Sequence, residues 1–165
     1  MAPIKVGPRL LRLWLSFALA LAHIIDVMQI HASCAARDGE GVLLLGPPGS
    51  GKSDMVLRLL DRGFALVADD RVDVVNGVAR PPPALAGLLE VRGLGVVRLP
   101  YAPEARLALA VVLGASERLP AAEFHPGLGV PQVRVDPAQA SAARRVALAL
   151  DCALGRVIQV AGAFA

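Results

Sequence analysis

One segment of the chain has the residue types and spacing of a phosphate-binding loop: Gly46-Pro47-Pro48-Gly49-Ser50-Gly51-Lys52-Ser53. Glycines in such a loop allow backbone N–H groups to turn inward around phosphate oxygens. Lys52 is suited to reach the β- and γ-phosphates, and the Ser53 hydroxyl can ligate magnesium. The chain has 15 arginines but only two lysines, so a lysine at this position is notable. The segment predicts binding of a nucleoside triphosphate with Mg²⁺.

A pair of carboxylates, Asp69 and Asp70, follows Lys52 by 17 and 18 residues and comes directly after an apolar run over 65–68. Carboxylates beside a P-loop can bind magnesium or take the proton from an attacking hydroxyl. The alternative is a solvated strand end followed by Arg71. His31 precedes the loop, and a lone histidine on a strand is more often structural than catalytic. The one asparagine, Asn76, is followed by glycine, which excludes the guanine-specifying motif of GTPases.

The elements that must position these residues are those of a strand-rich α/β domain. Apolar patterns predict strands over 29–37, 42–45, 65–68, 96–99 and 107–113, with a tight turn over 38–41. A hairpin over 72–80 is predicted around Asn76-Gly77, which suits a type I′ turn. Helical spacing predicts a helix over 53–62 that stops at Gly63, a loop over 120–129, and a terminal helix over 138–154.

Composition excludes several classes of protein. Hydrophobic residues make up 55% and charged residues 19% of the 165 residues, which excludes intrinsic disorder. Aromatic residues at 4% do not suit a base-stacking surface, and the net charge of +3 falls to +1 without residues 1–27. We therefore expect no nucleic-acid partner. Two cysteines, Cys34 and Cys152, cannot form a disulfide framework or a four-thiolate zinc site.

Residues 1–27 form a separate N-terminal extension, and the domain is expected over 28–165. Basic residues precede an uncharged run over 13–25, the pattern of a targeting segment, but the run is short of the roughly 20 residues that span a bilayer. The other interpretations are an added helix and, favoured here, sequence upstream of a true start at Met28. Because the P-loop needs a cytosolic nucleotide, we expect a cytoplasmic protein without a membrane partner.

Five segments together resemble the catalytic domain of HPr kinase/phosphorylase, in a short form that lacks the usual N-terminal domain. They are Ile30-His31, the P-loop, Arg62-Gly63, Leu66-Val67-Ala68-Asp69-Asp70-Arg71-Val72-Asp73 and Leu89-Glu90-Val91-Arg92-Gly93-Leu94-Gly95. The resemblance is close from Gln29 to Gly95 and weaker through Asp136. It implies a P-loop kinase domain of the HPr kinase and PEP carboxykinase-like type, with a strand-rich mixed sheet and flanking helices.

The resemblance also implies an activity: ATP-dependent phosphorylation of a serine of HPr, the phosphocarrier of the sugar phosphotransferase system, with a reverse phosphorolysis. It implies a homo-oligomer, a hexamer. By position, Asp70 matches the proton acceptor, Asp69 its neighbour, and His31 the active-site histidine. Glu90 matches a magnesium ligand beside Ser53. Arg92 lies in the catalytic segment and Arg118 matches an active-site arginine, although both Glu90 and the arginines could also be ordinary solvated charges.

One segment departs from the family pattern. Longer members carry a basic loop for dephosphorylation, where this chain has Val135-Asp136-Pro137-Ala138-Gln139-Ala140. The forward kinase reaction is therefore the safer inference. Two other functions stay open: a P-loop kinase of a small metabolite or nucleotide, whose arginine-bearing lid would have to use Arg144-Arg145, and a non-catalytic ATP-binding regulatory subunit.

Overall fold

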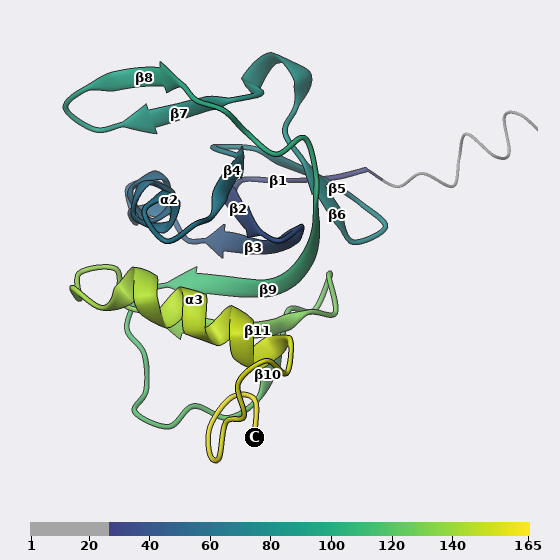
Figure 1. Cartoon of the computed structure of the whole chain (residues 1–165), viewed down its shortest axis with the longest axis vertical. Coiled ribbons are helices and arrows are strands. Elements are labelled where there is room, and N and C mark those ends of the chain that lie inside the picture. The colour runs from purple at the N-terminus through teal and green to yellow at the C-terminus, as the bar shows by residue number, and fades with distance from the viewer. Residues whose placement is uncertain (1–26) are drawn as a thin grey trace, which may run out of the picture.

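The computed structural model describes residues 27–165, and a mixed β-sheet organises this part of the chain (Figure 1). Seven strands follow the order β1-β5-β6-β9-β3-β2-β4, and β11 and β10 extend the sheet from β9. The strands are β1 (Met28–Ile30), β2 (Ser33–Arg37), β3 (Glu40–Leu45), β4 (Ala65–Ala68), β5 (Val72–Val75), β6 (Val78–Arg80), β9 (Ala105–Leu113), β10 (Glu123–Phe124) and β11 (Pro131–Val135).

A separate two-stranded sheet and three helical segments complete the described residues. The hairpin consists of β7 (Leu88–Val91) and β8 (Gly95–Arg98), preceded by the 3₁₀ turn η1 (Pro83–Leu85). The two α-helices are α2 (Lys52–Leu60) and α3 (Ala142–Ala153). Figure 1 shows the β7–β8 hairpin on one side of α2 and α3 on the other. None of these helices is long and apolar enough to cross a membrane, within the described part of the chain.

The centre of the sheet is parallel. β3 pairs with β9 in parallel, with Leu43 opposite Ala110, and β9 pairs with β11 in the same sense. All other strand pairs are antiparallel. Parallel neighbours need a long crossover, so the chain between β3 and β9 has room for α2, the β5–β6 hairpin and the β7–β8 hairpin. Because the P-loop follows β3, which lies between β9 and β2, the loop leaves the sheet from an inner strand.

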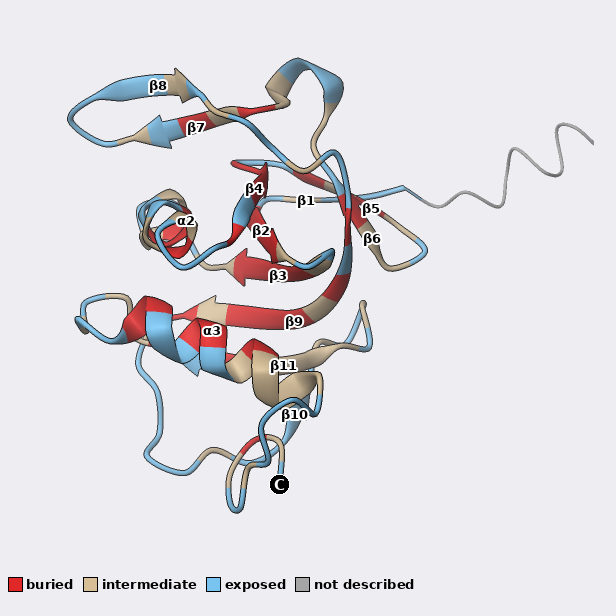
Figure 2. Cartoon of the chain, viewed as in Figure 1, coloured by how far each residue is buried: buried red, intermediate tan, exposed pale blue. Residues whose placement is uncertain are grey.

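Buried apolar residues form a cluster on each face of this sheet. Figure 2 shows its central strands, β3 and β9, coloured mostly as buried. Val42 and Leu44 of β3 pack on the face covered by α2 and α3, together with Val146 of α3. Leu43, between them in sequence, packs on the opposite face with Val67. Successive side chains of a strand point to opposite faces, so a strand buried on both faces needs an uninterrupted apolar run. This explains the continuous run over 42–45.

Most of the predicted elements are confirmed. α2, the β5–β6 hairpin and strands β3, β4, β8 and β9 lie where the patterns placed them. One predicted strand, over 29–37, is wrong as a single element because the chain changes partners at His31-Ala32. β1 pairs with β5, whereas β2 pairs with β3 and β4.

The C-terminal region also differs from expectation. The predicted helix over 138–154 begins only at Ala142, because Asp136 accepts the N–H groups of Ala138 and Gln139 and holds these residues in a turn. β10 lies inside the predicted loop over 120–129, and strands β7 and β11 were not predicted. The interpretations of the N-terminal segment fall on residues 1–26, outside the described residues.

The two cysteines provide a test of this core. Cys34 on β2 is fully buried, and burial raises the pKa of its thiol to about 12. Cys152 on α3 is partly exposed, with a pKa raised by burial and by the Asp151 charge. The rate of alkylation depends on the fraction of thiolate and on the access of the reagent. We therefore expect iodoacetamide at pH 8 to modify Cys152 slowly and Cys34 only after unfolding. Mass spectrometry counts the modified cysteines. Modification of Cys34 in a folded Cys152→Ser variant would contradict this packing.

Candidate active site

The P-loop connects the end of β3 to the first turn of α2. Gly51 caps the helix with a φ of 91°, a left-handed conformation that glycine adopts without a Cβ penalty. The four N–H groups at the start of a helix have no intrahelical partner, and they point out of the helix end with its positive dipole. The loop and α2 together therefore form a site for an anion such as a phosphate.

Lys52 is the first residue of α2 and lies across this loop. Its ammonium donates hydrogen bonds to the carbonyl oxygens of Gly46 at 2.8 Å and Pro47 at 3.1 Å. The residue is buried, and this burial lowers its pKa, while the negative charges of Asp69 and Asp70 act to raise it. Lys52 thus places a cation between the loop and the carboxylate pair.

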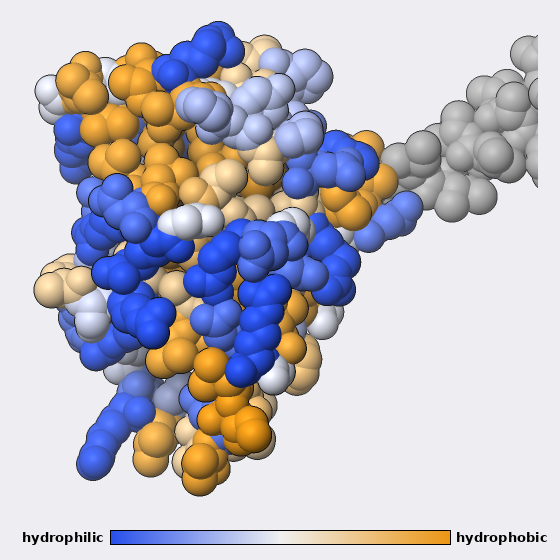
Figure 3. Space-filling view, viewed as in Figure 1, coloured by the Kyte–Doolittle hydropathy of each residue, from blue (hydrophilic) through white to orange (hydrophobic). Residues whose placement is uncertain are grey.

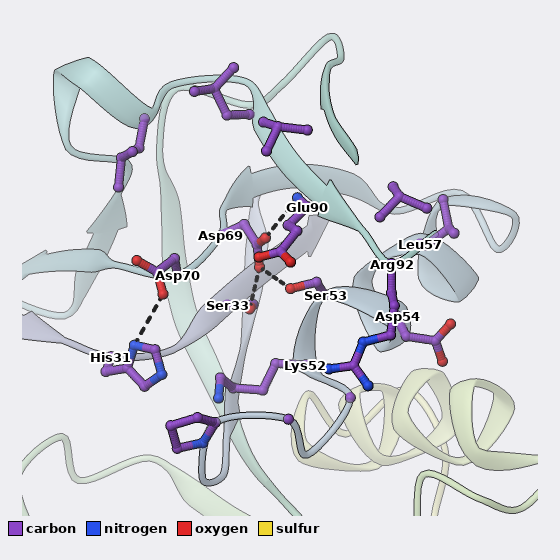
Figure 4. A pocket seen from close by; sticks show the side chains of 17 residues that line it. His31, Ser33, Lys52, Ser53, Asp54, Leu57, Asp69, Asp70, Glu90 and Arg92 are labelled. Carbon is purple, nitrogen blue, oxygen red and sulfur yellow. Dashed lines mark hydrogen bonds and ion pairs between the residues drawn. The ribbon is translucent and has the colours of Figure 1, made fainter. Parts of the chain in front are cut away.

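Asp69 is buried directly after β4 and accepts three hydrogen bonds from three different segments (Figure 4). Its Oδ1 atom accepts from the Ser33 hydroxyl at 2.6 Å and from the Ser53 hydroxyl at 2.9 Å. Its Oδ2 atom accepts from the Glu90 backbone N–H at 3.2 Å. One carboxylate therefore connects β2, α2 and β7.

Replacing Asp69 by alanine tests this structural connection. The change leaves two hydroxyls and one backbone N–H without their acceptor, so we expect the free energy of unfolding to fall by about 3 kcal/mol. Urea denaturation measures the loss. Asp61→Ala removes an exposed carboxylate at the end of α2 and is expected to change stability by less than about 0.5 kcal/mol. Equal stability of the two variants would contradict the described network.

Asp70 faces solvent, unlike its neighbour. Its φ of 67° is unusual for a residue other than glycine, although aspartate tolerates it better than most. Its Oδ1 atom lies 3.3 Å from Nδ1 of His31, and the two side chains are 62% and 49% exposed. His31 occupies the break between β1 and β2, so its side chain is free to meet Asp70 (Figure 4).

These residues line one cavity of about 760 Å³ between the P-loop and the β7–β8 hairpin. Among the predicted residues, it brings together His31, Pro48, Gly49, Gly51, Lys52, Ser53, Asp69, Asp70, Glu90 and Arg92. The P-loop residues Gly46, Pro47 and Ser50 complete the loop without lining this cavity. Arg118 is exposed in the loop between β9 and β10 and does not line the cavity.

Sequence reasoning missed several residues of the cavity wall. Ser33 and the apolar residues of the wall, Leu57, Leu85, Leu88, Val91 and Val96, were not singled out. A serine two positions after His31 was a weak signal, because the strand break could not be foreseen. Hydrophobic side chains gather over the β7–β8 hairpin on the face shown in Figure 3. Leu94 and Val96 of this hairpin are exposed.

The oxygen donors of this cavity suit magnesium. The Ser53 hydroxyl and the exposed Glu90 carboxylate both face the cavity, on α2 and β7. Magnesium in phosphate-transferring sites is commonly held by one or two protein oxygens together with phosphate oxygens. These two side chains therefore fit the group that the P-loop pattern implies.

Comparison with known proteins places part of this chain in a family. Residues 22–102 match the family model of the HPr Serine kinase C-terminal domain. This part of the chain belongs to that family. An HPr kinase/phosphorylase from Lacticaseibacillus casei is 50% identical over 81 residues, which cover 46% of this chain and 25% of that protein. An HPr kinase/phosphorylase from Cupriavidus metallidurans is 37% identical over 138 residues, covering 73% of this chain and 42% of that protein.

A solved structure shares the fold of the described domain. The HPr(Ser) kinase/phosphatase from Coxiella burnetii aligns with a TM-score of 0.64 at 23% identity, over 78% of this chain and 92% of that chain. The predicted α/β architecture, a mixed sheet with flanking helices, is confirmed. The chain spans less than half the length of the two HPr kinase/phosphorylases described above.

Proposed function

We propose that this HPr kinase domain, over residues 28–165, transfers the γ-phosphoryl group of ATP to a serine of HPr, the phosphocarrier of the sugar phosphotransferase system. One observation carries the proposal: a single cavity contains the P-loop lysine, the Ser53 hydroxyl and an exposed carboxylate paired with histidine. ATP and Mg²⁺ are the proposed cofactors. A cytoplasmic location, which the need for a cytosolic nucleotide supports, and a homo-oligomer, a hexamer by family likeness, are part of the same proposal.

Binding and charge stabilisation come from the P-loop. Lys52 and the backbone N–H groups at the start of α2 hold the phosphates and stabilise the charge that develops on them. Ser53 and Glu90 would hold Mg²⁺, which neutralises phosphate charge when bound. Because phosphoryl transfer passes through a loose transition state, positioning and electrostatics account for most of the rate.

Asp70 is the proposed general base. Its exposed carboxylate can accept the proton of a seryl hydroxyl brought by a protein substrate, while the seryl oxygen forms a bond to the γ-phosphorus. The bond from this phosphorus to the bridging oxygen breaks, and ADP leaves. His31 contacts Asp70 and orients its carboxylate. In the reverse direction Asp70 returns the proton.

The two other functions predict different results: a metabolite kinase transfers phosphate to a small molecule, and a regulatory subunit transfers it to no acceptor. Arg144 and Arg145, the arginines that a metabolite kinase would need in a lid, lie on α3 and do not line the cavity. Radiolabelled ATP offered with HPr, with a mixture of metabolites, or without acceptor separates the three functions. We expect label on a serine of HPr. Label on a metabolite would support a small-molecule kinase, and ATP binding without transfer would support a regulatory subunit.

The segment that replaces the basic loop lies beside the P-loop. The carbonyl of Pro137 accepts a hydrogen bond from Arg58 at 2.9 Å. The Cβ atom of Pro137 lies 3.7 Å from the position that a Cβ atom on Gly51 would occupy. Asp136 precedes it and would repel inorganic phosphate. We expect the ratio of phosphorolysis to kinase activity to be low, and Asp136→Arg to raise it about tenfold, the equivalent of about 1.4 kcal/mol.

Both directions are measured on the same HPr and phosphoserine-HPr. Asp136→Asn keeps a side-chain oxygen that can accept the Ala138 N–H and is expected to give an intermediate ratio. Glu117→Arg makes the same charge change in the exposed loop after β9 and should leave the ratio unaltered. An unchanged ratio in Asp136→Arg would show that this segment does not control phosphate.

A further inference from the structure

Ser33 is a buried hydroxyl in a strand of the central sheet. Its neighbours on β2, Cys34 and Ala35, belong to the apolar clusters on either face. Burying a hydroxyl without a hydrogen-bond partner is unfavourable, so packing alone would favour a small apolar residue at this position. Its hydroxyl donates to Asp69 at 2.6 Å, the shortest of the three contacts that this carboxylate makes.

Two hydroxyls meet at the same carboxylate oxygen. Ser33 and Ser53 both donate to Oδ1 of Asp69, and Oδ2 has only the longer contact to the Glu90 N–H. With both hydroxyls in place, rotation of the carboxylate breaks three hydrogen bonds, including the short one from Ser33. Without Ser33, only the bond from Ser53 and the longer bond from the Glu90 N–H oppose this rotation. Ser33 therefore fixes the orientation in which Asp69 accepts the Ser53 proton.

Two of the three residues that donate to Asp69, Ser53 and Glu90, are the proposed Mg²⁺ ligands. When the hydroxyl proton of Ser53 points to Asp69, the lone pairs of the Ser53 oxygen remain available to a cation. The bond to the Glu90 N–H sets the position of β7 relative to α2. We propose that Ser33 is a positioning residue, which acts through Asp69 to set the Mg²⁺ affinity of the nucleotide site. The inference rests on the proposed nucleotide site but not on the identity of the acceptor.

The test is the Mg²⁺ dependence of nucleotide binding by the full chain, measured with a fluorescent ATP analogue after treatment with EDTA. Partners that orient metal ligands typically contribute about 10–100-fold in metal affinity. We expect Ser33→Ala to raise the half-saturating Mg²⁺ concentration at least about tenfold. Ser33→Cys keeps the shape but offers only a weak donor, and should behave like Ser33→Ala. Ser33→Thr keeps the hydroxyl and should remain close to the wild type.

Cys34→Ala is the matched control. It also removes one γ atom from a fully buried position of β2, but Cys34 makes no hydrogen bond to Asp69. Its Mg²⁺ dependence should equal that of the wild type. If Ser33→Ala does not fold, Ser33→Cys decides the outcome. Superimposable curves for Ser33→Cys and wild type, or an equal shift in Cys34→Ala, would overturn the inference.

The outcome is separable from that of the proposed kinase activity. A shifted Mg²⁺ dependence in a chain that does not phosphorylate HPr would support the role of Ser33 and contradict the proposed acceptor. Normal HPr phosphorylation by the wild type, together with an unshifted Mg²⁺ dependence in the Ser33 variants, would support the proposed acceptor and contradict the role of Ser33.

Discussion

Replacing Lys52 by alanine is expected to weaken ATP binding at least about 100-fold while the fold remains intact. From its place beside the Gly46 and Pro47 carbonyls, the ammonium would donate to the charged phosphate oxygens, which are stronger acceptors than the carbonyls. Hydrogen bonds to charged groups contribute about 1.5–3 kcal/mol each, so the loss of two corresponds to a factor of 100 or more in affinity. Alanine is the best helix former, so α2 can still begin at this position.

Calorimetry of ATP binding and urea denaturation measure the two halves of this prediction. Arg62→Ala is the control, because it removes an exposed cation just beyond the other end of α2. It should leave the ATP affinity within about twofold of the wild type, in line with the weakness of surface charges in water. Equal ATP affinities for Lys52→Ala and wild type would show that the P-loop does not hold the nucleotide in the proposed way.

Asp70→Asn is expected to lower the rate of HPr phosphorylation about 1,000-fold with little change in ATP affinity. A positioned general base contributes about 10²–10⁴ in rate, and asparagine cannot accept the seryl proton at neutral pH. The replacement keeps the size of the side chain. Asparagine also tolerates the positive φ of 67°, so the backbone need not change. The measurement is single-turnover transfer from labelled ATP at saturating nucleotide.

Asp38→Asn matches this variant in three respects. Asp38 also has a positive φ, of 55°, its side chain is 69% exposed, and it contacts a basic side chain, that of Arg156. It lies in the turn between β2 and β3, outside the cavity. Full activity of Asp38→Asn with loss in Asp70→Asn would assign the effect to position 70. Full activity of both would mean that another group accepts the proton.

Local sequence was sufficient for the elements whose contacts are local. The P-loop is a contiguous segment defined by its glycine spacing, a lysine and a serine, so its position between a strand and a helix was readable directly. The Asn76-Gly77 turn and the helical spacing of α2 also depend on near neighbours, and both elements are confirmed. The carboxylate pair was predicted at the end of β4, where the structure has it.

The different environments of that pair depended on tertiary structure. Asp69 is buried by Ser33, 36 residues before it, and by Glu90, 21 residues after it, while Asp70 remains exposed. No periodicity encodes such pairings, because they depend on how β2 and β7 pack at the end of β4. The sequence showed two adjacent carboxylates at the end of a strand. Packing decided that Asp69 is buried in a hydrogen-bond network and that Asp70 is exposed to solvent.

The same limit explains what was mispredicted. A continuous pattern over 29–37 predicted one strand, but exchange of the pairing partner from β5 to β3 divides it and releases His31 toward Asp70. Arg118 was expected in the active site from the family resemblance; it does not line the cavity of the described residues, and its role stays a prediction. The sequence by itself determined the ligand chemistry of the P-loop and its flanking strand and helix, because those contacts are local. Tertiary structure alone decided which distant side chains meet there, because sheet pairing and packing join segments whose separation in sequence carries no signal.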